Sequence, residues 1–399
     1  MLEILNHHRD AVRTILVTEG KTKIEVPDPE NFRTESGDYA PSLTRVFYNP
    51  DMELCRDISV SVAQTVAKTF NNLWVCDPLA GVGVRGIRYA NEVKGVLRSV
   101  VNDRSPEAFE LIRRNVELNG LSNLVESRST DANIVLLENR GRFNFVDLDP
   151  FGTPAPFVGA ACVSLSRRGM LALTATDTAP LSGTHARACV RRYGAKPLKT
   201  EYCHEIGIRI LIGFVQRIGG LHDMALTPVL AHATQHYFRI YLTARRGAQH
   251  SDVVLKKIGF ISHCDNCLRR TLTSGLAPEL PRICECGEKF SHAGPLWLGE
   301  LIDKQFAREV LQDLSVRDLK LKHREVELLN RCIEEADGPP TFYDLSELAR
   351  RSGMPPSKIV KLLSMIRERG YFASRTHFSS TGIRTNAHID EILKILKSA

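Results

Sequence analysis

The sequence contains no apolar run long enough to cross a membrane. Its most apolar stretch, residues 206–215, is short and is interrupted by Arg209, whereas a spanning helix needs about 20 apolar residues. Residues 1–14 also lack the apolar core that a secretory signal requires. We therefore expect a cytoplasmic protein that makes no membrane contact.

Internal repeats and low-complexity tracts are also absent, which excludes solenoid and mainly disordered architectures. Hydrophobic residues make up 43% of the 399 residues and charged residues 25%, an ordinary globular balance. A single hydrophobic core stops growing at about 250–300 residues. The chain should therefore form a large domain with smaller additions.

Cysteine is not scarce, and four of the ten cysteines are grouped. A chain that stays inside the cell should keep its thiols reduced or use them as metal ligands. One pair is separated by two residues and the other by one, with Gly287 after the second pair; the four are Cys264, Cys267, Cys284 and Cys286. This spacing predicts a structural Zn²⁺ site closed by four thiolates, for which His263 and His292 are spare ligands.

The net charge of +7 is unevenly distributed along the chain. Residues 187–257 contain twelve Lys and Arg against four Asp and Glu. A basic surface of this kind suits the phosphates of a nucleic acid, because each neutralised phosphate releases counterions. A solvated basic face without a partner would give the same count.

The order of apolar runs predicts a doubly wound, Rossmann-like α/β sheet. The expected strands are residues 73–76, 97–102, 124–128, 143–148 and 170–175. A helix should begin at Pro106, with Ser105 as its N-cap, and end before Gly120. Residues 224–232 and 236–243 follow without a helix between them, so they should form an antiparallel hairpin, as is typical of Rossmann-like methyltransferases.

A glycine-rich loop follows the first strand of this sheet. Gly81, Gly83 and Gly86 come shortly after Asp77, and the second strand ends at Asp103, which can accept hydrogen bonds from ribose hydroxyls. The same glycine spacing also fits a dinucleotide-binding fingerprint or a purely structural turn. The position of Asp77 and the spacer before Gly81 favour the loop of a methyltransferase, which holds the methionine and sugar of S-adenosylmethionine.

The fourth strand runs into Asp149, Pro150 and Phe151 at the carboxyl edge of the sheet, where open α/β sheets bind ligands. An exocyclic base amine is a weak nucleophile, and a carboxylate with a backbone carbonyl can orient it and disperse its developing charge. Asp149 and the Pro150 carbonyl supply these acceptors, and Phe151 can stack on the base. A plain strand with a proline turn does not explain the two acids Asp147 and Asp149. Asp177 is either part of the base pocket or a helix N-cap.

The C-terminal part has the order helix, turn, helix, hairpin. Residues 345–352 and 357–369 form the helices, and residues 371–378 and 383–385 form the hairpin, with Gly382 near its turn. This order predicts a winged-helix-like α+β domain. Arg375, His377 and Arg384 are candidates for contacts with backbone phosphates, although the unit could serve only for packing.

Several of these stretches together resemble the tRNA guanine-N2,N2-dimethyltransferases that modify guanine 26. The matching stretches are residues 46–57, 83–88, 147–152, 174–177, 185–193 and 376–382. The resemblance implies that Asp149 is catalytic and that S-adenosylmethionine contacts Arg56, Arg85, Asp103, Asp131 and Ala132. Arg56 or Arg85 would pair with the methionine carboxylate, and Asp131 would reach the adenine amine.

These observations predict a methyltransferase domain at residues 1–257, a zinc-binding segment at 258–300 and a tRNA-binding domain at 301–399. The expected reaction moves methyl groups from S-adenosylmethionine to the N2 amine of a guanine in tRNA, with tRNA as the partner and no obligate protein partner evident. Asp77 and Gly81 complete the expected cofactor site. An NAD-dependent enzyme and a non-enzymatic nucleic-acid-binding protein with a zinc site and a winged helix are the alternatives.

Overall fold

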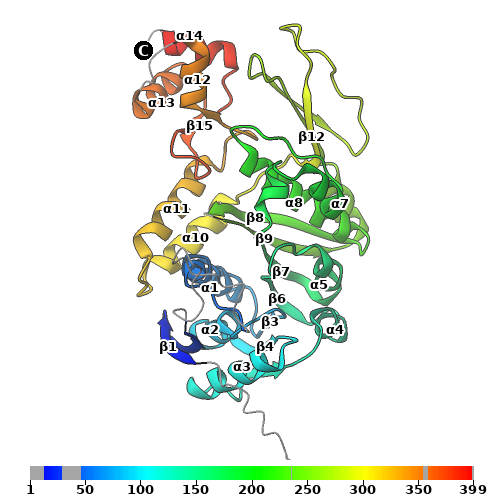
Figure 1. The fold of residues 1–399 in the computed structure, drawn as a ribbon, viewed down its shortest axis with the longest axis vertical. Helices are drawn as coiled ribbons and strands as arrows, with labels where there is room; N and C mark the ends of the chain where they lie inside the picture. Colours follow the sequence, from blue (N-terminus) through cyan, green and yellow to red (C-terminus); the bar gives the residue numbers. More distant parts are fainter. Residues whose placement is uncertain (1–12, 29–45, 235, 354–357, 398–399) are drawn as a thin grey trace, which may run out of the picture.

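A computed structural model describes residues 13–28, 46–234, 236–353 and 358–397 (Figure 1). The strands are β1 Thr14–Glu19, β2 Thr22–Pro27, β3 Leu73–Asp77, β4 Val96–Asn102, β5 Val125–Arg128, β6 Phe143–Leu148, β7 Leu165–Ala175, β8 Met224–Thr234, β9 Tyr237–Arg246, β10 Ile258–His263, β11 Arg270–Ser274, β12 Ser291–Trp297, β13 Tyr343–Asp344, β14 Ala373–Arg375 and β15 Gly382–Thr385. The α-helices are α1 Glu53–Ala67, α2 Val84–Glu92, α3 Pro106–Leu118, α4 Ala132–Glu138, α5 Val158–Ser164, α6 Thr178–Leu181, α7 Ala186–Tyr193, α8 Cys203–Gly220, α9 Ala248–Leu255, α10 Lys304–Ser315, α11 Lys322–Glu335, α12 Leu345–Ser352, α13 Ile359–Glu368 and α14 Ile389–Lys397. None of these described helices is long and apolar enough to cross a membrane.

A seven-stranded sheet with the order β5-β4-β3-β6-β7-β9-β8 forms the centre of the fold (Figure 1). Strands β5, β4, β3, β6 and β7 run parallel, whereas β9 pairs antiparallel with both β7 and β8. The α/β class and the final hairpin expected from the sequence are confirmed. Because the parallel strands share a direction, the residues after β3, β4 and β6 meet at one edge of the sheet.

Local sequence signals explain how the helices beside this sheet begin. The Ser105 hydroxyl accepts a hydrogen bond of 3.2 Å from the backbone N–H of Ala108, and Pro106 opens α3 as predicted. Helix α1 was not predicted. It buries almost all of its length, including Arg56 and Asp57, so it has no polar face that a pattern search could detect.

A buried ion-pair cluster attaches the N-terminal hairpin of β1 and β2 to helices α1 and α2. Glu19 accepts hydrogen bonds from Arg56 at 2.7 and 2.5 Å and lies 3.2 Å from Arg88. Burial alone would raise the pKa of Glu19, but the two guanidiniums lower it to about 2. The Glu19 carboxylate therefore stays ionised at neutral pH and holds the hairpin in place through its ion pairs.

Helices α10 and α11 pack against the large sheet and α1, not against the C-terminal unit alone. Their apolar side chains belong to the same core as the central strands; they are Ala307, Val310, Leu314, Leu329 and Cys332. In Figure 1 both helices lie beside α1. Residues 304–335 therefore share the hydrophobic core of the central sheet.

A separate three-stranded sheet, β11-β10-β12, carries the grouped cysteines and extends away from the central sheet (Figure 1). Its strands pair antiparallel, with β10 between the other two. Cys264 follows β10 directly, which brings its thiol to the end of this sheet.

The C-terminal unit runs from β13 to α14 and has its own small core, built from side chains such as Leu348, Leu362 and Ile392. The expected hairpin is confirmed, since β14 and β15 pair antiparallel. Residues 354–357, which include most of the expected turn and the first residue of the expected second helix, lie outside the described residues.

Buried ion pairs join this unit to helices α8 and α11. The Arg384 guanidinium donates to Glu205 of α8 at 2.8 and 3.1 Å and to Glu335 of α11 at 2.8 Å. His377 also binds Glu335, and its side chain is fully buried. The expectation that Arg384 and His377 contact phosphates is therefore wrong. Both side chains are buried and bind carboxylates that attach the unit to α8 and α11.

Part of the basic segment is also buried. Arg209 pairs with Glu205 and Arg239 with Asp147, and both guanidiniums are almost fully shielded from solvent. The count of charges along residues 187–257 therefore overstates the positive surface of that region.

Candidate active site and metal centre

Two adjoining cavities open at the carboxyl edge of the central sheet. The larger, of about 410 Å³, lies beside the glycine loop, and the smaller, of about 250 Å³, lies beside the β8–β9 turn. Four residues line both cavities: Phe47, Asp149, Pro150 and Phe151. The segment after β6 therefore stands where two ligands can meet.

The larger cavity brings together four of the residues expected to bind the cofactor. Gly81, Asp103, Asp131 and Ala132 all line it. The two carboxylates of Asp103 and Asp131 come from the ends of different strands, which is the usual arrangement for a nucleoside ligand at the edge of such a sheet.

Backbone donors fix the orientation of these carboxylates. Asp103 accepts 2.9 Å hydrogen bonds from the N–H groups of Gly81 and Ser105. Asp131 caps helix α4 by accepting from the N–H of Asn133 at 2.8 Å. Each carboxylate keeps lone pairs for further donors, so hydroxyl or amino groups of a ligand can bind to them.

Two glycines of the loop are required by packing within the protein. Gly81 has φ of +55°, and a Cβ there would lie 2.6 Å from the carbonyl oxygen of Phe47. A Cβ on Gly86 would lie 2.4 Å from a methyl group of Val101 on β4. The glycines thus let the chain around Phe47 and helix α2 approach the sheet closely.

Three other expected cofactor residues do not line either cavity. Arg85 is buried behind Asp149 and donates to its carboxylate at 2.6 Å, with further contacts to the Ser59 hydroxyl and the Cys55 thiol. Arg56 is engaged by Glu19. The structure therefore surrounds both arginines with protein partners.

Asp77 is the third. Its carboxylate accepts a 2.9 Å hydrogen bond from the N–H of Gly86, which holds the start of helix α2. Burial, followed by the negative charge of Asp147, raises the pKa of Asp77 to about 8. The side chain is therefore largely protonated at neutral pH. Its hydrogen bond to Gly86 holds the glycine-rich loop against the end of β3.

The neighbouring acids Asp147 and Asp177 have protein partners of their own. Asp147 is fully buried and accepts from Arg239 at 2.7 and 2.8 Å and from Tyr89. Burial opposes its ionisation, but Arg239 and then Arg85 lower its pKa overall. Asp177 occupies the N-cap position of α6 without a side-chain cap bond and instead binds Arg192 and Tyr193. Asp149, unlike Asp147 and Asp177, lines both cavities.

The smaller cavity has aromatic walls suited to a flat ring. Phe47 and Phe151 meet edge to face with ring centroids 4.0 Å apart, and Phe151 is 61% exposed. Thr176, His236 and Tyr237 complete the opposite side. Residues 46–50 belong to a stretch that resembles the family, but no local pattern marks Phe47 as a site residue, because its contact with Phe151 spans about a hundred positions.

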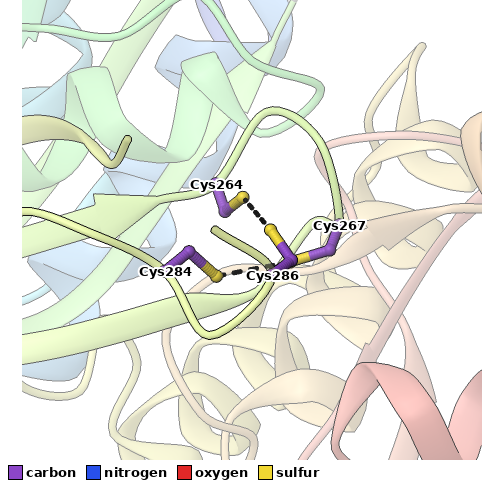
Figure 2. Close-up of side chains that lie close together, drawn as sticks. All are labelled: Cys264, Cys267, Cys284 and Cys286. Atoms are coloured by element: carbon purple, nitrogen blue, oxygen red, sulfur yellow. Dashed lines mark hydrogen bonds between the residues drawn. The ribbon is translucent and has the colours of Figure 1, made fainter. Parts of the chain in front are cut away.

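The four grouped cysteines converge, as Figure 2 shows. The Sγ atoms of Cys264 and Cys286 are 3.5 Å apart, as are those of Cys267 and Cys284. Tetrahedral coordination with Zn–S bonds of about 2.3 Å needs sulfurs about 3.8 Å apart. The donor set and its spacing therefore fit a zinc ion, with a slight expansion of the cluster.

Comparisons with known proteins agree with the family resemblance seen in the sequence, and they cover almost the whole chain. A family profile described as N2,N2-dimethylguanosine tRNA methyltransferase matches residues 20–397. The tRNA (guanine(26)-N(2))-dimethyltransferase of Methanosphaera stadtmanae is 44% identical over 385 residues and is covered over 96% of its length, as is this chain. The tRNA (guanine(26)-N(2)/guanine(27)-N(2))-dimethyltransferase of Aquifex aeolicus is 37% identical over 384 residues, 95% of each chain.

A solved structure is also similar along its full length. The complex of Trm1 from Pyrococcus horikoshii with S-adenosyl-L-methionine superposes with a TM-score of 0.84 and 36% sequence identity. The similarity covers 96% of this chain and 99% of that one.

Proposed function

This chain belongs to the N2,N2-dimethylguanosine tRNA methyltransferase family, and from that premise we propose how its residues carry out the reaction. The enzyme transfers methyl groups from S-adenosylmethionine to the exocyclic N2 amine of guanine 26 in tRNA. The observation that supports our assignment of residues is the pair of cavities that share Asp149, Pro150 and Phe151. Membership of this family excludes the two alternative functions, an NAD-dependent enzyme and a non-enzymatic nucleic-acid-binding protein.

We assign the smaller cavity to the guanine and Asp149 to its amine. The Asp149 carboxylate and the Pro150 carbonyl accept the amine N–H bonds, which turns the nitrogen lone pair toward the larger cavity. S-adenosylmethionine supplies an electrophilic methyl group. The nitrogen gains positive charge as its bond to the methyl group forms and the bond between that methyl group and sulfur breaks. The fixed carboxylate stabilises this charge until an N–H proton passes to it, and the Phe47 and Phe151 rings hold the base and exclude water.

Arg85 contributes to this chemistry through Asp149. Its Nε–H bond of 2.6 Å fixes one carboxylate oxygen and leaves the other free to accept from the base. We propose that Arg85 and Arg56 maintain the shape of the cofactor site from behind, while Gly81, Asp103, Asp131 and Ala132 contact the cofactor directly. Asp77 supports the loop.

Replacing Asp103 with asparagine should weaken S-adenosylmethionine binding by about 10- to 100-fold, because hydrogen bonds to a charged acceptor contribute about 1.5–3 kcal/mol. Titration calorimetry with the cofactor measures this. Asp252→Asn, an exposed acid on α9, is the matched control and should bind normally. Unchanged affinity in the Asp103 variant would remove it from the cofactor site.

The activity itself is tested by incubating the protein with methyl-labelled S-adenosylmethionine and unmodified tRNA. Digestion to nucleosides should place the label on N2 of guanosine, and mapping should locate it at position 26. Label on another atom or base would overturn the assignment of the smaller cavity.

We further propose that the cysteine cluster holds one structural Zn²⁺. Four thiolates leave no open position for a substrate, and the cluster lies on a separate sheet, so the ion would stabilise the β10–β12 segment.

Metal analysis should find about one zinc per chain, and Cys286→Ser should lower that content sharply. Chelation should increase hydrogen exchange in residues 258–297 while cofactor binding stays nearly unchanged, because none of the cysteines lines the larger cavity. Cys203→Ser, outside the cluster, is the control and should retain zinc. A zinc-free protein from a chelator-free purification would contradict the proposal.

For the C-terminal unit we propose a winged-helix-like role in binding tRNA. Its order of strand, two helices and hairpin supports this reading. The sequence suggested one domain over residues 301–399. Because α10 and α11 share the catalytic core, we propose that the C-terminal unit begins near Thr341. We also propose that the enzyme works in the cytoplasm, where tRNA is available.

A further inference from the structure

A third cavity, of about 440 Å³, lies next to the proposed guanine pocket, and three arginines line it. Arg324 and Arg331 come from α11, and Arg375 comes from β14 of the C-terminal unit. This groove plays no part in the chemistry described above.

The charge of the groove is only partly compensated. Arg331 lies 3.7 Å from Glu327, which also lines the groove, and 3.5 Å from Glu334. Within the described part of the chain, no ion pair or side-chain hydrogen bond engages the guanidinium of Arg324 or Arg375. Two cations are therefore available to an anionic ligand.

The neutral residues of the groove suit the same kind of ligand. Thr234 and Ser380 bring hydroxyl groups to its wall. Arginines combined with hydroxyl groups are the side chains that bind the phosphates and sugars of nucleic acids. Leu54, Ala233 and Leu328 also line the groove, but its two uncompensated guanidiniums make it unsuited to an apolar peptide.

The groove and the guanine pocket are lined by residues that lie close together in two segments of the chain. Thr234 lines the groove and His236 lines the pocket, so they are separated by at most about 7 Å of extended chain. On the other side, Met52 lines the pocket and Leu54 lines the groove, both at the start of the same helical segment. A nucleotide chain leaving the pocket thus enters the groove directly.

Buried contacts hold the groove in place against the pocket. The Nε2 atom of His377 accepts a 3.2 Å hydrogen bond from the N–H of Ala233 beside the β8–β9 turn, and its Nδ1 binds Glu335 of α11. The three elements that form the walls are therefore fixed relative to one another before any ligand binds.

We propose that this groove binds the backbone phosphates of the tRNA strand next to the methylated guanine, with Arg324 and Arg375 as the phosphate ligands. The proposal rests on the proposed function and adds the path of the RNA strand to it. It also gives the C-terminal unit a stated role: Arg375 reaches the strand, while Arg384 and His377 only hold the unit in place.

The test is the full-length Arg324→Gln/Arg375→Gln enzyme with unmodified tRNA. Each lost phosphate contact should lower the slope of log Kd against log salt by about 0.7–0.9, so the double variant should lose about 1.4–1.8. Its affinity for tRNA should fall about 10-fold or more, while cofactor affinity and the single-turnover rate at saturating tRNA remain normal. Arg140→Gln is the control, because Arg140 is exposed and precedes β6 at the opposite edge of the sheet.

Phosphate ethylation interference locates the contact on the RNA. In the wild type, ethyl groups on one or two phosphates beside guanine 26 should block binding, and the double variant should lose that sensitivity. An unchanged salt slope, or interference at the same phosphates in both proteins, would overturn the groove proposal while methylation continues. Absence of methyl transfer by the wild type would instead overturn the proposed function.

Discussion

Replacing Asp149 with asparagine should lower the single-turnover methylation rate by about 100-fold or more, by analogy with the loss of one preorganised electrostatic partner in other enzymes. The amide keeps the shape of the side chain but lacks the negative charge that offsets the charge developing on the guanine amine. It also presents a donor where the amine needs an acceptor. Rapid mixing of preformed enzyme and tRNA with labelled cofactor measures this step separately from product release.

A second acid in the same pocket provides the matched control for this experiment. Asp51 lines the smaller cavity but not the larger one, so Asp51→Asn should react at nearly the normal rate. Cofactor titration should show similar affinity in both variants, which excludes general misfolding. If Asp149→Asn reacted normally, the acceptor would lie elsewhere. Asp147 could not replace it, because Arg239 and Tyr89 enclose it, and Asp177 is likewise held by Arg192 and Tyr193 outside both cavities.

Replacing Arg384 with methionine should lower the free energy of unfolding by about 3–5 kcal/mol, the usual cost of removing one partner from a buried ion pair. Methionine fills much of the volume but leaves Glu205 and Glu335 buried with fewer positive partners. The C-terminal unit should then separate from the catalytic core at lower urea concentration, as urea titration with hydrogen exchange can detect.

Arg375→Met is the control for this stability test, because the guanidinium of Arg375 has no ion-pair partner within the described residues. It should leave the unfolding midpoint nearly unchanged. Equal stability of the Arg384 variant and the wild type would mean that apolar packing alone docks the unit.

The pH dependence of stability gives an independent check on the same cluster. Burial would raise the pKa of Glu335, but Arg384 and His377 lower it to about 2 from an ordinary value of about 4.5. A carboxylate with a lowered pKa stabilises the fold fully above its unfolded-state pKa and loses that contribution as the pH falls. The wild type should therefore lose stability between pH 4.5 and 2, and the gap between it and Arg384→Met should narrow over that range.

The sequence alone determined the features that depend on short-range patterns. Alternating apolar runs identified the central strands and the β8–β9 hairpin, and Ser105 with Pro106 identified the start of α3. The spacing of the cysteines predicted the cluster that the structure brings together. Residues that follow parallel strands must share one edge of the sheet, so Asp103 and Asp149 could be assigned to the site without coordinates.

Tertiary structure alone decided which charged side chains line the cavities and which face other parts of the protein. Arg56 pairs with Glu19, and Arg384 pairs with Glu205, which lies 179 positions earlier in the chain. No local pattern encodes such a pair, because an arginine on the surface and one in a buried ion pair look alike in sequence. The partner is set by how distant elements pack, and the cost of burying an unpaired charge then makes that pairing obligatory.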